Sequence, residues 1–336
     1  MVCQRQGRLR EAVAELERAV RLDAKDAEAR FHLSLALLHA GDFERGWDEY
    51  ECRFQYEASA RDFGVPPWDG TRLADRRLLI YAEQGVGDEI MFASCLPEVI
   101  GQTASCVVEC DPRLVPLFAR SFPLADVVPR PFAAEELHGA GRCDTQAALG
   151  TLPRFLRRRL DSFPRQRRYL NADPAAVEKW RQRFAALGPG LKVGLSWRGG
   201  NNPSIRRSRS TALEAWRPVL SIDGAHFISL QYGETEADIA ACRQQFDRPI
   251  HAWKDADPLV DLDDFAAQIA SLDLVISVDN STVHMAGALG VDVWTLLPFS
   301  PNWRWMLGRD DSPWYSTMRL FRQPRPGDHL HRRARR

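Results

Sequence analysis

Apolar and polar positions follow two different rhythms along this chain. Through residue 54, apolar residues recur every three or four positions, which predicts helices over 8–23, 27–40 and 42–54. Beyond Pro66-Pro67-Trp68, short β-branched runs alternate with one-faced helical stretches, a pattern typical of parallel sheets with helices on both faces. The strands predicted there are 77–82, 106–110, 125–128, 192–197, 226–231, 274–278 and 291–297. The helices predicted between them are 88–100, 174–187, 211–221, 235–246, 262–272 and 281–289.

The helical part repeats itself at a fixed spacing. Gly7 recurs 34 positions later as Gly41, and Leu16 recurs as Tyr50. Helical hairpins with this period have the register of a tetratricopeptide repeat, and about one and a half units are present. Because about three units are needed for a free-standing array, either upstream repeats are missing or these helices pack on the following domain.

The alternating part divides near residues 160–190, where Asp173-Pro174 and Gly188-Pro189-Gly190 interrupt the pattern. We therefore expect an α/β protein in four parts. These are the repeats at 1–56, a Rossmann-like domain at 68–172, a second one at 173–324, and a disordered basic tail at 325–336. Two such domains that face each other form a cleft at the carboxyl ends of their strands, where ligands bind.

The composition of the chain argues against several classes of protein. Among the 336 residues, 45 Lys+Arg balance 45 Asp+Glu, and this neutrality argues against nucleic acid as a partner. No apolar run reaches the roughly 18 residues of a transmembrane segment, and no signal-peptide core follows Met1. The seven cysteines include no C-x-x-C pair, which favours reduced thiols over a zinc site. These features predict a cytoplasmic protein.

The first candidate site is the stretch EQGVGDEIMF, which follows the strand at 77–82. Gly85 and Gly87 permit a tight turn close to a ligand, although neither the P-loop nor the dinucleotide-binding pattern is complete. Asp88 then has two interpretations. It could cap the following helix by accepting backbone N–H bonds, or it could accept a proton from a substrate hydroxyl.

The second candidate site is the stretch DNSTVH, which follows the strand at 274–278. The free N–H groups of the next helix, together with the hydroxyls of Ser281 and Thr282, could hold a diphosphate without a metal. His284, one turn further, could donate to a phosphate or sugar oxygen. The alternative is a capped helix with a partly buried histidine.

Three other features have structural and functional interpretations. Carboxylate pairs could bind a metal diphosphate, but they also suit a helix N-terminus. An arginine-rich segment could meet a phosphorylated acceptor or form a solvated face. Three tryptophans could stack on a sugar or pack in a core. The features are Asp255 with Asp257, Asp261 with Asp263, the segment 154–168, and Trp303, Trp305 and Trp314.

The two candidate sites together resemble a known pair of motifs. GDEIMFASCLP and DNSTVHMAGALG resemble those of the heptosyltransferase-like glycosyltransferases of family 9, and residues 7–328 are similar to bacterial proteins in which tetratricopeptide repeats precede such a domain. This resemblance implies a GT-B fold: two Rossmann-like domains, the first binding the acceptor and the second a nucleotide-sugar donor. It also implies inverting transfer without a metal. Supporting stretches are GDFERGWDEYECRF, LLIYAEQGVGDEIMF, DTQAALGTLPRFL, VGLSWRGG and WTLLPFSPNWRWMLGRDDSPWYSTMRLFRQ.

The resemblance also implies residue roles. Asp88 becomes the general base, and Gln84, Gly85 and Gly87 form a loop on the acceptor side. The turn after the second-domain aspartate departs from the family pattern, because Asn280 and Ser281 replace the usual residues. The donor-binding residues that it implies are Arg198, Arg209, Glu234, Asp279, Asn280, Ser281, Thr282 and His284.

The sequence thus predicts an enzyme that moves a hexosyl- or heptosyl-type sugar from a nucleotide-sugar to a hydroxyl acceptor, with no cofactor and no metal. The acceptor could be a glycan, a lipid-linked glycan or a protein, and the helices could bind a protein partner. The alternative is a non-catalytic scaffold that carries a degenerate transferase domain. The altered DNSTVH turn and the short repeat array favour this second interpretation.

Overall fold

The computed structural model describes residues 8–57, 60–132, 143–200 and 203–325. The predicted tail, apart from Arg325, lies outside these residues, as do positions 1–7 of the predicted repeats. The chain forms two compact units, each assembled from separate stretches of sequence. One comprises Met1–Val115, Phe122–Pro164 and Ser300–Arg309, and the other comprises Pro116–Ser121, Arg165–Phe299 and Asp310–Arg336.

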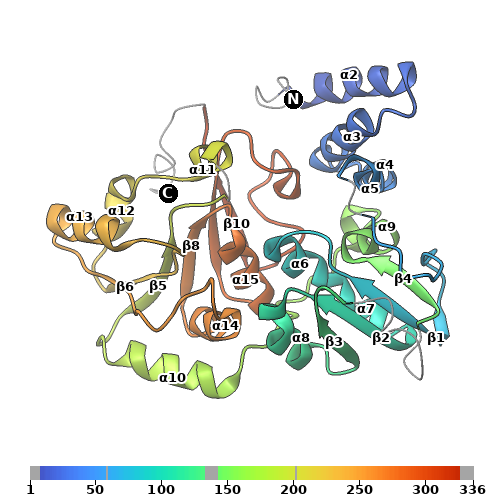
Figure 1. The fold of residues 1–336 in the computed structure, drawn as a ribbon. Helices are drawn as coiled ribbons and strands as arrows, with labels where there is room; N and C mark the ends of the chain where they lie inside the picture. The colour runs from blue at the N-terminus through green and yellow to red at the C-terminus, as the bar shows by residue number, and fades with distance from the viewer. Residues whose placement is uncertain (1–7, 58–59, 133–142, 201–202, 326–336) are drawn as a thin grey trace. The chain divides into compact units, whose positions relative to one another are not determined.

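The first unit begins with the predicted helices (Figure 1). Asp26 and Asp42 lie at helix N-termini, where their carboxylates accept backbone N–H bonds and satisfy donors that have no partner inside the helix. Gly41 ends the second helix at φ +86°, a left-handed conformation that favours glycine. The three helical predictions are confirmed, except that the third is interrupted at residues 51–52. The elements are α2 (Leu9–Leu22), α3 (Ala27–Ala40), α4 (Phe43–Tyr50) and α5 (Arg53–Tyr56).

A four-stranded parallel sheet follows in the same unit, with strand order β3-β2-β1-β4. Three of its strands are predicted by their apolar runs. The fourth, TQAA, was not predicted, because it is short and, apart from Thr145, its residues are poor strand formers. The elements are β1 (Leu73–Tyr81), α6 (Val86–Phe92), α7 (Leu96–Ile100), β2 (Thr103–Cys110), α8 (Val115–Ser121), β3 (Ala125–Pro129), β4 (Thr145–Ala148) and α9 (Leu152–Leu156).

The second unit contains a six-stranded parallel sheet of order β10-β9-β8-β5-β6-β7. Helices cover both of its faces, with α12 and α13 on one side and α14 and α15 on the other (Figure 1). The sequence does not predict β7, β10 or α11. The elements are α10 (Pro174–Ala185), β5 (Leu191–Ser196), α11 (Pro203–Arg209), α12 (Arg217–Leu220), β6 (Ala225–Ser229), α13 (Glu236–Phe246), β7 (Ile250–His251), α14 (Leu262–Ala270), β8 (Leu274–Val278), α15 (Ser281–Leu289), β9 (Val293–Leu297) and β10 (Met318–Arg322).

In each sheet, the order in which successive strands are added reverses at one point. In the first sheet the order reverses between β1 and β4, and in the second it reverses between β5 and β8. Ligands of open parallel sheets bind outside the carboxyl ends of strands at such reversals, because the following loops diverge there. The two predicted sites follow β1 and β8, and therefore each lies at a reversal point of its own sheet.

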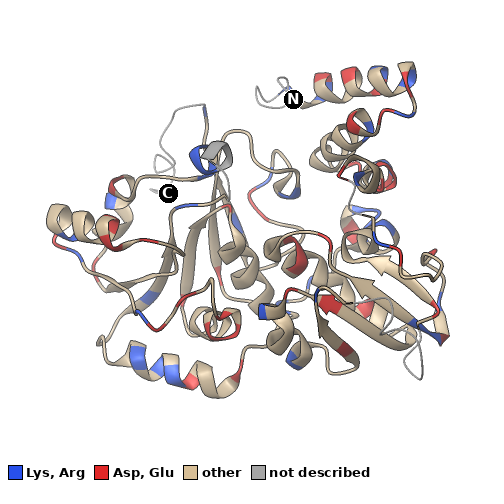
Figure 2. Ribbon diagram, in the orientation of Figure 1, with Lys and Arg blue, Asp and Glu red and all other residues tan. Residues whose placement is uncertain are grey.

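Two further features concern the distribution of charged side chains and the length of the helices. Acidic and basic residues are interspersed along the exposed helix α2 instead of gathering by sign (Figure 2). None of the helices in the described parts of the chain is long and apolar enough to cross a membrane.

Candidate functional sites

The first site is the loop that joins β1 to α6. Gly85 is the N-cap residue of α6 and has an extended backbone, with φ −82°. Its carbonyl accepts from the backbone N–H groups of Asp88 and Glu89 at 2.9 and 3.0 Å. Neither Gly85 nor Gly87 has a positive φ, so the backbone conformation of this turn does not itself require glycine.

Asp88 lies in the first turn of α6, but it does not cap that helix. Its Oδ1 accepts a hydrogen bond from Nη2 of Arg304, which lies in the short turn Trp303–Trp305. The Arg304 side chain is 10% exposed and that of Asp88 is 24% exposed, so this ion pair is largely shielded from water. No described residue donates to Oδ2 of Asp88, which leaves that oxygen available to a ligand.

The residues before Asp88 are held by the N-terminal helices. Arg53 is fully buried and donates to both Glu83 oxygens, with Nη2 at 2.8 Å from Oε1. Burial raises the pKa of Glu83, and the Arg53 charge opposes that rise. The Gly150 N–H also donates to Glu83 Oε1, and a Cβ at position 150 would lie 2.5 Å from this oxygen. Gln84 Nε2 donates to the Tyr50 hydroxyl at 2.8 Å.

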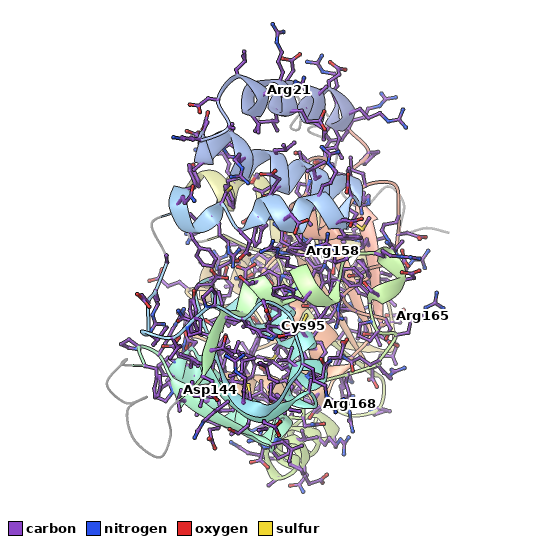
Figure 3. All side chains as sticks on the ribbon, turned by 90° about the vertical axis from the view of Figure 1, so that its right-hand side faces the viewer. Arg21, Cys95, Asp144, Arg158, Arg165 and Arg168 are labelled. Carbon is purple, nitrogen blue, oxygen red and sulfur yellow. The ribbon has the colours of Figure 1, made fainter. Side chains whose placement is uncertain are left out.

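The N-terminal helices contact the segment that follows α9. Trp47 is buried, and its indole N–H donates to the Arg157 carbonyl at 2.9 Å. Arg158 pairs with Asp48 and Glu44 of α4, and it is labelled beside these helices in Figure 3. The helices therefore pack on the domain that follows them, and part of the arginine-rich segment serves this packing.

Charged residues surround the same loop at the ends of β2 and β3. Arg130 donates to the Gln84 carbonyl at 2.9 Å and to Asp111 at 3.1 Å. Glu89 is 1% exposed and accepts from the Asp111 N–H at 2.7 Å. Arg130 Nη1 lies 3.1 Å from Glu89 Oε1, close enough for an ion pair but without hydrogen-bond geometry. Burial raises the pKa of Glu89 to about 7, whereas hydrogen bonds from Arg113 lower the pKa of Asp111 to about 2.

The second site is built around the turn from β8 to α15. Asn280 caps α15, since its Oδ1 accepts from the Thr282 N–H at 3.0 Å. Its Nδ2 donates to Ser196 Oγ at 2.8 Å and to the Arg198 carbonyl at 3.0 Å, at the end of the neighbouring strand β5. Asn280 was expected from sequence to bind the donor. In the structure its side chain joins the two strands that border the reversal point.

Asp279 and Thr282 differ from Asn280, because the structure leaves their polar atoms unsatisfied. The Asp279 side chain is 1% exposed, and neither carboxylate oxygen accepts a hydrogen bond from a described residue. Arg209 Nε lies 3.5 Å from Oδ2 and provides a partial countercharge. The buried Thr282 hydroxyl also has no hydrogen-bond partner within the described ranges. Buried polar groups are nearly always hydrogen-bonded, so these two groups make the turn a candidate position for a ligand.

The remaining predicted donor-binding residues have surroundings that differ from those of Asp279 and Thr282. Ser281 is half-buried at the first position of α15. Arg198 pairs with Asp238 at 3.1 Å and also donates to the carbonyl of Glu234, whose side chain is exposed. His284 is 2% exposed, and its Nδ1 lies 2.8 Å from the Tyr315 hydroxyl, inside the domain.

Sequence reasoning missed two residues at these sites. Gln231 is buried, and its Oε1 accepts from the backbone N–H groups of Trp197 and Arg198 at 2.9 and 2.7 Å. It lies two residues after the end of β6, and a polar residue at the carboxyl end of a strand is the signal that could have identified it. Arg304 is the other, and nothing in its local sequence relates it to Asp88.

The other sequence features have structural partners. Asp261 caps α14, and Asp263 forms an ion pair with Arg120 at 2.6 Å. The structure shows no group of three metal-ligating side chains within its described ranges. The three tryptophans are at most 7% exposed, as expected for packing: Trp303, Trp305 and Trp314.

Comparison with known proteins identifies the fold. The sequence matches no protein-family profile. It is 36% identical over 333 residues to protein FlbA of Caulobacter vibrioides, an alignment that covers 94% of this chain and 56% of FlbA. The chain thus spans a little over half the length of this relative.

Two solved structures have the same architecture at low sequence identity. One is a glycosyl transferase of family 9 from Veillonella parvula, with a TM-score of 0.53 at 12% identity, covering 75% of this chain and 87% of that one. The other is the ADP-heptose LPS heptosyltransferase II of E. coli, also at 0.53 and 12%, with 73% and 89% covered. The fold is therefore GT-B-like: a pair of Rossmann-like domains preceded by a helical segment.

Proposed function

We propose that this protein is an inverting, metal-independent glycosyltransferase that uses a nucleotide-sugar donor. The observation that carries the proposal is the pair of unsatisfied groups on Asp279 and Thr282. A carboxylate that only accepts hydrogen bonds requires donors, and sugar hydroxyls provide them. The adjoining N-terminal end of α15 and the guanidinium of Arg209 favour an anion, such as a diphosphate. A nucleotide-sugar combines both requirements in one molecule.

The chemical step in this proposal belongs to Asp88. The acceptor hydroxyl attacks the anomeric carbon, the bond from that carbon to the diphosphate oxygen breaks, and Asp88 takes the hydroxyl proton. Oδ2 is the oxygen available for this proton, because Oδ1 is held by Arg304. The amides of α15 and Arg209 stabilise the negative charge that develops on the leaving diphosphate.

Ligand binding tests this function directly. Thermal unfolding is measured with ADP, GDP, UDP and CMP, and with UDP-, GDP- and ADP-sugars. A ligand at about 100 times its dissociation constant stabilises the fold by about 2.7 kcal/mol. We expect one nucleotide class to raise the melting temperature of the wild type. Asp279→Asn and Arg209→Gln should weaken that response, and the exposed Arg207→Gln, on the same helix as Arg209, should not.

The alternative function is that of a non-catalytic scaffold. In that case none of the nucleotides or nucleotide-sugars changes the melting temperature. The same result would remove the basis of the proposed transferase activity.

A further inference from the structure

The N-terminal helices hold both segments that form the Asp88–Arg304 pair. One segment, residues 83–88, comprises the loop after β1 and the first turn of α6, and the other comprises the turn Trp303–Trp305 and its C-cap residue Met306. The two segments are far apart in sequence, yet both contact α3, α4 or α5. A ligand site that depends on two separate segments requires something that fixes them relative to each other.

The first contact holds the loop. The Tyr50 hydroxyl accepts from Gln84 Nε2 at 2.8 Å, and Arg53 binds the Glu83 carboxylate with two of its nitrogens. Tyr50 is 4% exposed, and the Arg53 guanidinium lies over its ring at 4.6 Å from the centroid. Two adjacent loop residues, the fourth and fifth before Asp88, are therefore anchored to one helical surface.

The second contact holds the turn. The Trp47 ring meets the Trp303 ring edge to face, with centroids 5.5 Å apart and planes at 88°. The Tyr50 ring lies 6.1 Å from the same Trp303 ring. Gly41 leaves space for the Met306 side chain, because a Cβ there would lie 2.9 Å from its Cε. Tyr50 therefore contacts both segments, one through its hydroxyl and the other through its ring.

We propose that Tyr50 and Trp47 are positioning residues for the Asp88–Arg304 pair, an inference that rests on the proposed transferase function. Arg304 binds one oxygen of Asp88 and thereby orients the other toward the acceptor. Tyr50 and Trp47 fix the two backbones so that this orientation is kept. Because proton transfer requires a heavy-atom distance of about 2.6–3.2 Å, small displacements of the loop slow the reaction without affecting donor binding in the second unit.

The test compares two tyrosines in adjacent helices. Tyr50→Phe removes only the hydroxyl that holds Gln84, and Tyr56→Phe makes the same change at a 42% exposed residue of α5. The assay is hydrolysis of the sugar nucleotide that most stabilises the wild type, with water as acceptor. We expect Tyr50→Phe to lower kcat about tenfold with the donor KM unchanged, and Tyr56→Phe to leave both constants unchanged.

A variant series at position 304 separates positioning from general stability. Lysine keeps the positive charge but lacks the planar fork, so Arg304→Lys should retain part of kcat and Arg304→Gln should retain much less. A parallel rise in KM and fall in kcat in Tyr50→Phe would overturn the proposal. Equal kcat values for Arg304→Lys and Arg304→Gln would overturn it as well.

A measurement that does not depend on activity completes the design. In amide hydrogen exchange, residues 84–89 of Tyr50→Phe should exchange faster than those of Tyr56→Phe, since one anchor of the loop is lost. Identical exchange in the two variants would contradict the positioning role even in a protein without transferase activity. Absence of hydrolysis by the wild type, with the exchange difference present, would instead contradict the proposed function alone.

Discussion

Arg304 donates a hydrogen bond to Asp88 across 216 positions of sequence, and both side chains belong to the same compact unit. The pair explains how a residue near the end of the chain becomes part of a site that begins after β1. The environment of Asp88 also differs from that of a helix-capping residue. Its Oδ1 accepts a hydrogen bond from Arg304, whereas its Oδ2 has no hydrogen-bond partner among the described residues.

The buried Arg53–Glu83 pair should contribute strongly to stability. Arg53→Met leaves the Glu83 carboxylate, which is 2% exposed, without its countercharge. Breaking a buried ion pair in this way costs about 3–5 kcal/mol, so the free energy of unfolding in urea should fall by that amount. The double variant Arg53→Met with Glu83→Leu should recover much of the loss, because the 2% exposed Glu83 carboxylate is then removed and the other partner of Arg53, Glu51, is 25% exposed.

An exposed pair in the same helical segment provides the control. Arg45 and Glu17 have side chains that are 53% and 30% exposed, and such pairs contribute about 0–1 kcal/mol. Arg45→Met should therefore change the unfolding free energy by less than about 1 kcal/mol. A similar loss in both variants would show that the helices, and not the buried pair, limit stability.

Glu89 should make stability depend on pH. Its pKa is raised from 4.5 to about 7, mainly by burial. A carboxyl with a raised pKa stabilises the folded state below its unfolded pKa, and this stabilisation is lost as the pH rises through the folded pKa. Between pH 4.5 and 7 the wild type should lose on the order of 2–3 kcal/mol relative to Glu89→Gln. Urea unfolding at several pH values measures this difference, and parallel curves would exclude the raised pKa.

Asn280 should prove to be a structural residue. Asn280→Asp keeps the acceptor for the Thr282 N–H but places a carboxylate oxygen against the carbonyl of Arg198. We expect a loss of about 1–3 kcal/mol in unfolding free energy, which is the cost of leaving buried polar groups unmatched. Thermal or urea unfolding measures it. Unchanged stability with weaker nucleotide binding would instead assign Asn280 to the donor site.

Much of the fold follows from the sequence, because apolar periodicity reflects burial. Strand β8 and helix α15 have the predicted bounds of 274–278 and 281–289. The strands β4 and β7 were missed for a physical reason: β4 lacks β-branched residues apart from Thr145, and β7 has only two residues. Pairing with neighbouring strands stabilises both β4 and β7, and the residues of those neighbouring strands lie elsewhere in the sequence.

The site was predictable only in part. The position of Asp88 and of the 279–284 turn after strands was evident from the pattern. The burial of His284 and the multiple bonds of Asn280 depend on distant residues, such as Tyr315 and Ser196. The return of residues 300–309 to the first unit likewise depends on tertiary packing, and so the partner of Asp88 could not be identified from sequence.

The most direct test of the account is donor hydrolysis by Asp88→Asn at saturating sugar nucleotide. Asparagine has nearly the same shape, but it cannot accept the proton. The account predicts that kcat falls by about 10²–10⁴, the usual contribution of a positioned general base, while the same protein keeps the thermal response to the nucleotide. A kcat equal to that of the wild type would contradict the role of Asp88 in the chemical step.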